Sequence, residues 1–133
     1  MAAIHLETLC KATRTLSERV GAFLRSELGR VRAEQIETKQ RNHLVSYVDQ
    51  TAERQLVEGL SALLEDAAFR AEEGTVIHEQ RDWQWIVDPL DGTTNFLHGL
   101  PFFSISIALQ FKGETGLGVV HEAMRQERFY SWK

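Results

Sequence analysis

Apolar residues recur at the spacing of one helical face in the first part of the chain. Over residues 3–29 this stripe consists of Leu9, Leu16, Val20, Phe23, Leu24 and Leu28. A repeat of about 3.6 residues turns such positions toward one side of a helix, where they can be buried together. Gly29 is suited to end the helix, because glycine readily adopts the left-handed conformation found after helix C-termini. We therefore predict one long helix here.

A second helical stripe follows a polar connection. Residues 31–42 are mostly polar, so we expect an exposed connection with room for a short strand. From Asp49 to about Glu65 the apolar residues again share one face, formed by Ala52, Leu56, Leu60, Leu63 and Leu64. Asp49 is the expected start signal, because short acidic side chains favour the first positions of helices. The pattern predicts a second helix from Asp49 to about Glu65.

After the second helix the period changes from that of helices to that of strands. Apolar runs or alternating positions occupy residues 67–71, 83–87, 104–111, 116–121 and 129–132. Turn residues around Gly113 and around Arg125 and Gln126 predict hairpins between the last three of these segments. Two helices followed by mostly antiparallel strands predict an α+β layered domain, with the helices packed on the sheet.

Composition narrows the class of protein. The 133 residues include 15 Lys and Arg against 19 Asp and Glu, 43% are hydrophobic and 26% are charged, as expected for one globular domain. The net charge of -4 provides no broad attraction to nucleic acid or to anionic lipid, so neither is expected as a partner. The chain shows no signal-peptide pattern and no membrane-spanning apolar run. The single Cys10 is expected to be a buried helix residue, and we expect a cytoplasmic location.

Two carboxylates follow the apolar residues 85–87 at close spacing. Asp88 comes at the end of the predicted strand, Pro89 is expected to stop its hydrogen-bond ladder, and Asp91 comes shortly after. Like charges so close are unfavourable unless a cation neutralises them, and a site made of oxygen ligands favours Mg2+. We therefore consider Asp88 and Asp91 candidate metal ligands.

The next residues suggest an anion site beside that metal. Gly92, Thr93 and Thr94 open a predicted short helix, whose free backbone N–H groups could hold a phosphate. A structural alternative competes with this hypothesis, because Asp-Gly is a common turn dipeptide. An Asx turn followed by a threonine N-cap would explain the same residues without any chemistry. The spacing alone leaves both interpretations open.

Residues 88–96 (Asp-Pro-Leu-Asp-Gly-Thr-Thr-Asn-Phe) closely resemble the signature of the inositol monophosphatase family, and residues 98–102 continue as that family does. The resemblance extends to residues 44–49, which lead to an acidic residue before a helix, and to Ala71-Glu72-Glu73, where the family usually has Gly-Glu-Glu. It implies the layered α/β sandwich of the sugar phosphatases. Residues 1–133 would then form the amino-terminal domain, and the carboxy-terminal domain would be absent.

The resemblance also implies roles for individual residues. The metal ligands for Mg2+ would be Glu72, Asp88, the backbone carbonyl of Leu90, Asp91 and, for a further and weaker ion, Asp49. Glu72 and Thr93 would orient the attacking water, with Asp49 beside them among the catalytic residues. Gly92, Thr93 and Thr94 would bind the phosphate.

Plainer interpretations remain for several residues. Glu73 is expected to be solvated or to support a ligand, Asp49 alone would ordinarily be a helix N-cap, and Lys39 would be surface charge. The histidines show no zinc-ligand spacing. A core position or a subunit contact is expected for Trp83, Trp85, Phe102, Phe103, Phe111 and Phe129.

The resemblance implies a Mg2+-dependent phosphomonoesterase that hydrolyses inositol monophosphate or a related small metabolite. Bisphosphate nucleotides, fructose 1,6-bisphosphate and histidinol phosphate are the alternative substrates. Family members are about twice as long and carry another acidic ligand in the later half, so this chain alone is expected to be weakly active or inactive. Family members are commonly dimers, so a homodimer is expected. The alternative is a non-catalytic fragment or pseudoenzyme that acts as an interaction module through a sheet edge.

Overall fold

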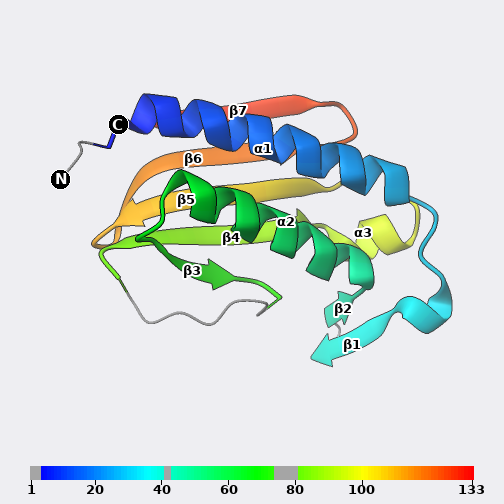
Figure 1. Ribbon diagram of the computed structural model, residues 1–133. Coiled ribbons are helices and arrows are strands. Elements are labelled where there is room, and N and C mark those ends of the chain that lie inside the picture. Colours follow the sequence, from blue (N-terminus) through cyan, green and yellow to red (C-terminus); the bar gives the residue numbers. More distant parts are fainter. Residues whose placement is uncertain (1–3, 41–42, 74–80) are drawn as a thin grey trace.

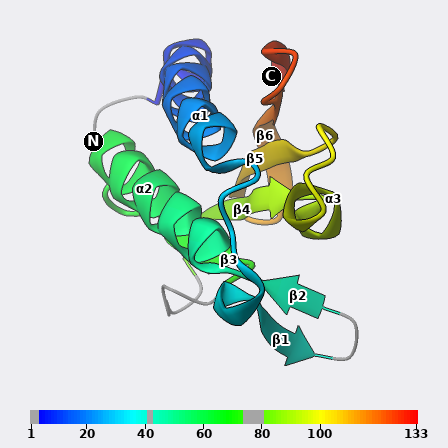
Figure 2. The same cartoon turned by 90° about the vertical axis from the view of Figure 1, so that its right-hand side faces the viewer.

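Two helices cover one face of a five-stranded sheet (Figure 1). The computed structural model describes residues 4–40, 43–73 and 81–133. Helix α1 (Leu6–Glu27) and helix α2 (Tyr47–Leu63) run side by side on the same side of the sheet (Figure 2). This two-layer arrangement confirms the predicted α+β class.

The sheet has the strand order β3-β4-β5-β6-β7. Its strands are β3 (Ala68–Ala71), β4 (Trp83–Asp91), β5 (Ser104–Phe111), β6 (Glu114–Glu122) and β7 (Glu127–Trp132). Among the described strands of this sheet, β3 and β4 pair in parallel and the other neighbouring strands pair antiparallel. The prediction of a mostly antiparallel sheet is therefore confirmed. The parallel pair brings the C-terminal ends of β3 and β4 to the same edge.

Four short elements complete the described fold. A 3₁₀ turn η1 (Ala33–Gln35) precedes a separate two-stranded sheet of β1 (Glu37–Gln40) and β2 (His43–Val45), in the segment where a short strand was expected. A short helix α3 (Thr93–Leu97) follows β4. Both α2 and α3 contact β2, so these elements gather around the end of β4.

The hydrophobic core lies between the two helices and the sheet. It includes Leu16, Val20 and Leu24 of α1, Leu56 and Leu60 of α2, and Trp85, Ile105, Ile107, Leu109, Leu117 and Val119 of the sheet. Cys10 is buried here, as predicted. Gly59 lets α1 and α2 approach closely, because a Cβ at this position would lie 2.7 Å from the Leu16 side chain.

The helix boundaries agree with the predicted ones within a few residues, but Asp49 is not the N-cap of α2. The first helix ends before Gly29, which has the left-handed φ of 82°. The N-cap of α2 is Ser46, whose hydroxyl oxygen accepts the N–H of Val48 at 3.2 Å. Asp49 is the third helical residue and closes a capping box, since its Oδ2 accepts the N–H of Ser46 at 3.0 Å.

Strand β4 continues past Pro89, so the expectation that this proline stops the ladder is wrong. Asp88 pairs with Ser106 and Asp91 pairs with Ser104, which leaves two residues of β4 opposite one of β5. The bulge accommodates a proline, which cannot donate a ladder hydrogen bond. As a result Asp88 and Asp91 both belong to the end of one strand.

The aromatic residues divide between the core and the surface. Trp85 and Phe103 are buried as predicted, and Trp83 is partly buried. Phe102, Phe111 and Phe129 are 59%, 40% and 60% exposed, so they do not take the core position, and the alternative of a subunit contact stays a prediction for them. Phe129 pairs with Val120 on the sheet face that carries no helix in the described residues, which explains its exposure.

Candidate active site

The residues singled out in the sequence meet at a cavity of about 320 Å³ at the end of β4. Its lining consists of Leu44, Glu72, Glu73, Asp88, Leu90, Asp91, Gly92, Thr93, Thr94 and Asn95. These residues come from β2, from the segment after β3, from β4 and from the start of α3. Of the predicted site residues, only Asp49 does not line this cavity directly.

The parallel pairing of β3 and β4 brings Glu72 beside Asp88. Ala71 is the register partner of Val87, and the N–H of Glu72 donates to the carbonyl of Val87 at 3.3 Å. Glu72 directly follows β3, and Asp88 directly follows Val87 in β4. Because the two strands run in parallel, both carboxylates lie at the same end of the sheet. Side chains distant in sequence thereby become neighbours.

Asp88 carries the electrostatic signature of a carboxylate cluster. Its pKa is raised to about 6, first by burial and then by the negative charge of Asp91. The charges of Glu72 and Asp49 raise it further, and a hydrogen bond from the backbone N–H of Leu90 partly offsets the rise. Carboxylates from three segments therefore act on one group, which is the situation that a bound cation relieves.

Asp49 reaches the cavity through Thr93. The Thr93 hydroxyl oxygen lies 2.8 Å from Oδ1 of Asp49 and 3.0 Å from the carbonyl oxygen of Leu90. A hydroxyl has one hydrogen, so it donates to one of these acceptors at a time. Asp49 is fully buried, and burial raises its pKa while the hydrogen bonds from Thr93 and Ser46 lower it. Asp49 thus lies behind the cavity lining and fixes the orientation of Thr93.

The turn after Asp91 requires a glycine. Gly92 has φ 101°, and a Cβ there would lie 2.9 Å from the carbonyl oxygen of Phe102. Helix α3 starts directly afterwards, as predicted, with Gly92 as its N-cap. The N-cap is therefore a glycine and not the threonine of the structural alternative, and the Asx-type hydrogen bond observed here belongs to Asp88, whose Oδ1 accepts the N–H of Leu90 at 3.3 Å.

Sequence reasoning missed the contribution of Glu53. This residue lies one turn after Asp49 on α2 and is fully buried, and its Oε1 accepts the backbone N–H of Glu73 at 2.6 Å. Glu73 itself lines the cavity and is partly buried. The signal available in the sequence was a glutamate on the same helical face as Ala52 and Leu56, where an unpaired charge would be costly.

The donor atoms around the cavity suit a hard cation. They are carboxylate and carbonyl oxygens, the ligand type that Mg2+ prefers. In the described ranges, no group of three or more His, Cys, Asp or Glu side chains forms a cluster that could hold a metal ion by itself. The side chain of Lys39 and residues 74–80 lie outside the described part of the chain. The oxygen donors are therefore of the type that Mg2+ prefers, but the described side chains do not by themselves form a complete set of ligands.

Comparison with known proteins gives a consistent result. A sequence model described as the inositol monophosphatase family matches residues 5–133. The chain is similar to the fructose-1,6-bisphosphatase/inositol-1-monophosphatase of Thermotoga maritima, with 42% identity over 117 residues, which is 87% of this chain and 44% of that protein. It is also similar to the Nus factor SuhB of Vibrio cholerae, with 42% identity over 100 residues, or 73% of this chain and 38% of that one.

A solved structure shows the same arrangement of elements. The extragenic suppressor protein suhB of Bartonella henselae superimposes with a TM-score of 0.86 at 35% identity, over 92% of this chain and 48% of that chain. The chain therefore spans less than half the length of these relatives. Within the described residues, no helix is long and apolar enough to cross a membrane.

Proposed function

The chain belongs to the inositol monophosphatase family, and from this premise we propose that it forms the amino-terminal part of a Mg2+-dependent phosphomonoesterase. The substrate is inositol monophosphate or a related small sugar or nucleotide phosphate. Among the alternatives, fructose 1,6-bisphosphate gains support from the double name of the Thermotoga maritima relative. The observation that carries the proposal is the meeting of Glu72, Asp88 and Asp91 at one cavity beside Thr93.

The acidic residues have separate tasks in this proposal. Glu72, Asp88 and Asp91, with the carbonyl of Leu90, line the cavity at the end of β4 and would hold magnesium there. When bound, Mg2+ neutralises charge on the phosphoryl oxygens and lowers the pKa of a bound water. The raised pKa of Asp88 supports this assignment, because a carboxylate that is disfavoured alone gains most from a cation.

Thr93 and its neighbours orient the reacting groups. Asp49 accepts the Thr93 hydroxyl at 2.8 Å, so the hydroxyl group is held in the lining of the cavity that Glu72 also lines. Together Thr93 and Glu72 position a water for in-line attack on phosphorus. The backbone N–H groups of Gly92, Thr93 and Thr94 receive the phosphate, which suits the left-handed turn at Gly92.

The test is a calorimetric titration of this chain with Mg2+ in the presence of inorganic phosphate. We expect saturable binding that weakens by at least about tenfold in the Asp88→Asn, Asp91→Asn double variant. The matched control is Asp66→Asn, Asp82→Asn, which removes two exposed carboxylates that do not line the cavity. Equal binding by both double variants would refute the assigned ligands.

Activity is expected of the longer protein rather than of these 133 residues alone. The chain covers 44% of its Thermotoga maritima relative, and the resemblance assigns a further acidic ligand to the later half. We therefore propose that the isolated chain hydrolyses inositol 1-phosphate weakly or not at all. A turnover rate typical of an enzyme, on the order of 10 per second, would contradict this.

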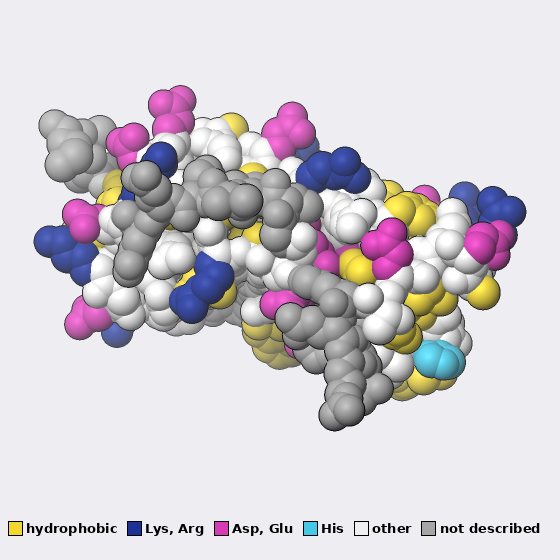
Figure 3. Space-filling view, turned by 90° about the horizontal axis from the view of Figure 1, so that it is seen from below, with side chains coloured by type: hydrophobic (Ala, Val, Ile, Leu, Met, Phe, Trp, Pro, Cys, Tyr) yellow, Lys and Arg dark blue, Asp and Glu magenta, His cyan; other side chains and the backbone are white. Residues whose placement is uncertain are grey.

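The second candidate function is a non-catalytic interaction module. It is favoured by one specific finding, the name Nus factor SuhB among relatives about as similar as the bifunctional phosphatase. On the face shown in Figure 3, the described Lys and Arg side chains are scattered among Asp and Glu side chains. The expectation that nucleic acid is not a partner rests on the net charge of -4. That expectation, a cytoplasmic location and a homodimer stay predictions. If neither the parent chain nor the variants bind Mg2+ in the calorimetric titration, the non-catalytic interaction module is favoured.

A further inference from the structure

A second polar cavity, of about 330 Å³, lies between α1 and the ends of β6 and β7. Its lining includes Glu18, Arg19 and Arg25 from α1 and His121, Gln126 and Arg128 from the sheet side. It shares no lining residue with the candidate active site. Three arginines against one glutamate make the lining locally positive, in a chain whose net charge is -4.

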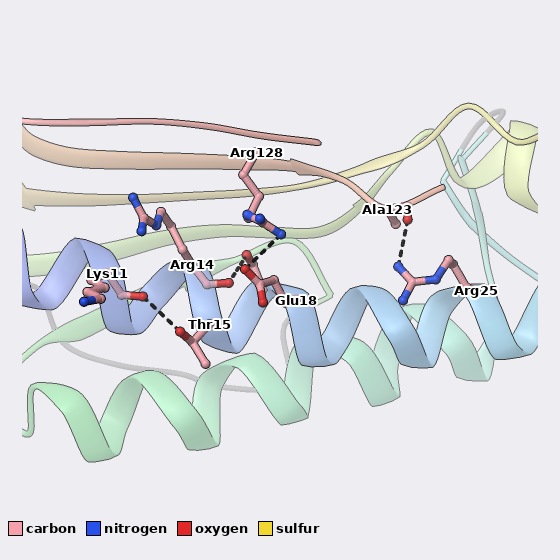
Figure 4. A network of polar contacts seen from close by, with 8 residues as sticks. Lys11, Arg14, Thr15, Glu18, Arg25, Ala123 and Arg128 are labelled. Carbon is pink, nitrogen blue, oxygen red and sulfur yellow. Dashed lines mark hydrogen bonds and ion pairs between the residues drawn. The ribbon is translucent and has the colours of Figure 1, made fainter. Parts of the chain in front are cut away.

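Two of the arginines are held in place by the fold. Nη1 of Arg25 donates to the carbonyl oxygen of Ala123 at 2.8 Å, and Nη1 of Arg128 lies 2.9 Å from Oε1 of Glu18 (Figure 4). Each contact uses one of several N–H donors of a guanidinium group. The guanidinium groups are thus oriented before any ligand arrives, which reduces the entropic cost of binding.

His121 makes this cavity different from an ordinary charged surface. It is 1% exposed, and neither ring nitrogen has a hydrogen-bond partner among the described residues. Native proteins rarely bury a polar side-chain atom without a hydrogen-bond partner. The ring is pressed against α1, where Gly21 makes room: a Cβ there would lie 2.6 Å from Nε2.

The sheet register brings the histidine and an arginine together. His121 of β6 and Arg128 of β7 are direct partners in the antiparallel ladder, so their side chains leave the same face of the sheet, toward α1. Burial lowers the pKa of His121, and the charges of Arg128 and Arg25 lower it further. A neutral ring offers one N–H donor, and the neighbouring guanidinium groups supply the positive charge.

We propose that this cavity is a second anion site, which binds a small oxyanion of the phosphate class between Arg19, Arg128 and His121. Phosphate oxygens match guanidinium donors in geometry, and a ligand with several acceptor oxygens has a further oxygen for an N–H at Nδ1 of His121, because Nε2 lies against Gly21 of α1. The two sources of this chemistry are free inorganic phosphate and the phosphate group of a phosphorylated metabolite. Neither depends on the carboxylates of the candidate active site.

The test follows the imidazole resonances of His121 by NMR while inorganic phosphate is added to this chain. The titration is run in EDTA at fixed pH and ionic strength, so that no divalent ion links phosphate to the first cavity. We expect a saturable shift, with affinity at least about tenfold weaker in Arg19→Gln and Arg128→Gln. Circular dichroism confirms that each variant is folded, and Arg128→Lys, which keeps the charge, is expected to retain more binding than Arg128→Gln.

The matched control is Arg14→Gln. Arg14 lies on the same helix and stacks over the Tyr130 ring at 3.8 Å, outside the lining of the cavity. We expect its phosphate affinity to stay within about twofold of the parent chain. A second titration with glycerol 3-phosphate separates the two sources, because only a site open to phosphomonoesters responds to it. The proposal is overturned if the His121 shift does not saturate with either ligand, or if Arg14→Gln loses as much affinity as Arg128→Gln.

Discussion

The backbone N–H of Glu73 donates to the carboxylate of Glu53 at 2.6 Å, although the two residues lie on different elements. Glu53 belongs to α2 and is fully buried, whereas Glu73 follows β3 and lines the candidate active site. The bond ties the segment that carries Glu72 to the helix that carries Asp49. The position of one candidate ligand therefore depends on a side chain that does not line the cavity.

Replacing Glu53 tests this dependence. Glu53→Leu leaves the N–H of Glu73 without this acceptor, so we expect a loss of about 1–3 kcal/mol in the free energy of unfolding and weaker Mg2+ binding. Glu53→Gln keeps an acceptor oxygen and is expected to restore most of the Mg2+ affinity. Urea denaturation and calorimetry measure the two effects. The control is Glu58→Leu on the exposed face of α2, and an equal loss of Mg2+ affinity there would contradict the positioning role.

The raised pKa of Asp88 predicts a pH-dependent stability in the absence of metal. With a pKa of about 6 in the folded chain against 3.8 as the ordinary value, the folded state binds more protons between these pH values. The destabilising effect of the charged carboxylate is fully present above pH 6 and is relieved as pH falls toward 4. We expect Asp88→Asn to be more stable than the parent by about 2 kcal/mol at pH 7.5, and the difference to shrink at pH 4.5. Urea denaturation at the two pH values measures this, and a constant difference would contradict the assignment.

The same group predicts how Mg2+ affinity depends on pH. A protonated Asp88 cannot act as an anionic ligand, so metal and proton compete for it. Affinity should be nearly constant above pH 7 and should fall below the pKa of about 6, by up to about tenfold per pH unit. Calorimetry at pH 7.5, 6.0 and 5.0 tests the trend. An affinity that does not change over this range would argue against Asp88 as a ligand.

Gly92 is expected to tolerate substitution poorly. Gly92→Ala places a Cβ 2.9 Å from the Phe102 carbonyl oxygen and also strains a backbone with φ 101°. Gly113 has a similar φ of 87°, but a Cβ there meets nothing within 4 Å, so Gly113→Ala isolates the cost of the backbone conformation. We expect Gly92→Ala to lose about 1–2 kcal/mol more than Gly113→Ala in urea denaturation. Equal losses would mean that the close approach to Phe102 relaxes at little cost.

His121 predicts an opposite pH effect from that of Asp88. Burial lowers its pKa below the ordinary 6.5, so on acidification the unfolded chain takes up a proton before the folded chain does. The stability that the neutral ring contributes is therefore lost as pH falls below about 6.5. His121→Phe should remove this loss, measured as a smaller difference in melting temperature between pH 7.5 and pH 5.5 in phosphate-free buffer. An unchanged difference would show that the ring is already solvated in the folded chain.

Local patterns predicted most of the fold because each element has its own periodicity. The stripes of α1 and α2 and the alternation of β5 each follow from burial of one face, and the structure agrees with them within a few residues. Pro89 was misjudged because a bulge depends on the register with Ser104 and Ser106, which local sequence does not contain. The exposure of Phe129 likewise depends on which sheet face the helices cover.

The candidate site was predicted from a contiguous sequence motif. Contributions that depend on tertiary contacts outside that motif were harder to predict. Asp88, Leu90, Asp91, Gly92 and Thr93 lie close together because they are close in sequence. The role of Glu53 was missed because it depends on a tertiary contact twenty residues away along the chain. The cavity around His121 was missed for the same reason, since it needs the pairing of β6 with β7 and the packing of α1.

The carboxylate of Asp49 divides its two oxygens between the start of α2 and the candidate site. Oδ2 accepts the N–H of Ser46, and Oδ1 accepts the hydroxyl of Thr93. Natural selection for a folded chain would therefore retain Asp49 even in a lineage whose catalysis had decayed. Asp91 is exposed and makes no comparable hydrogen bonds to the described residues, so its substitution would disturb the fold less than that of Asp49. In descendants of this chain, the presence of Asp49 reports a folded domain, whereas the presence of Asp91 reports selection on the chemistry.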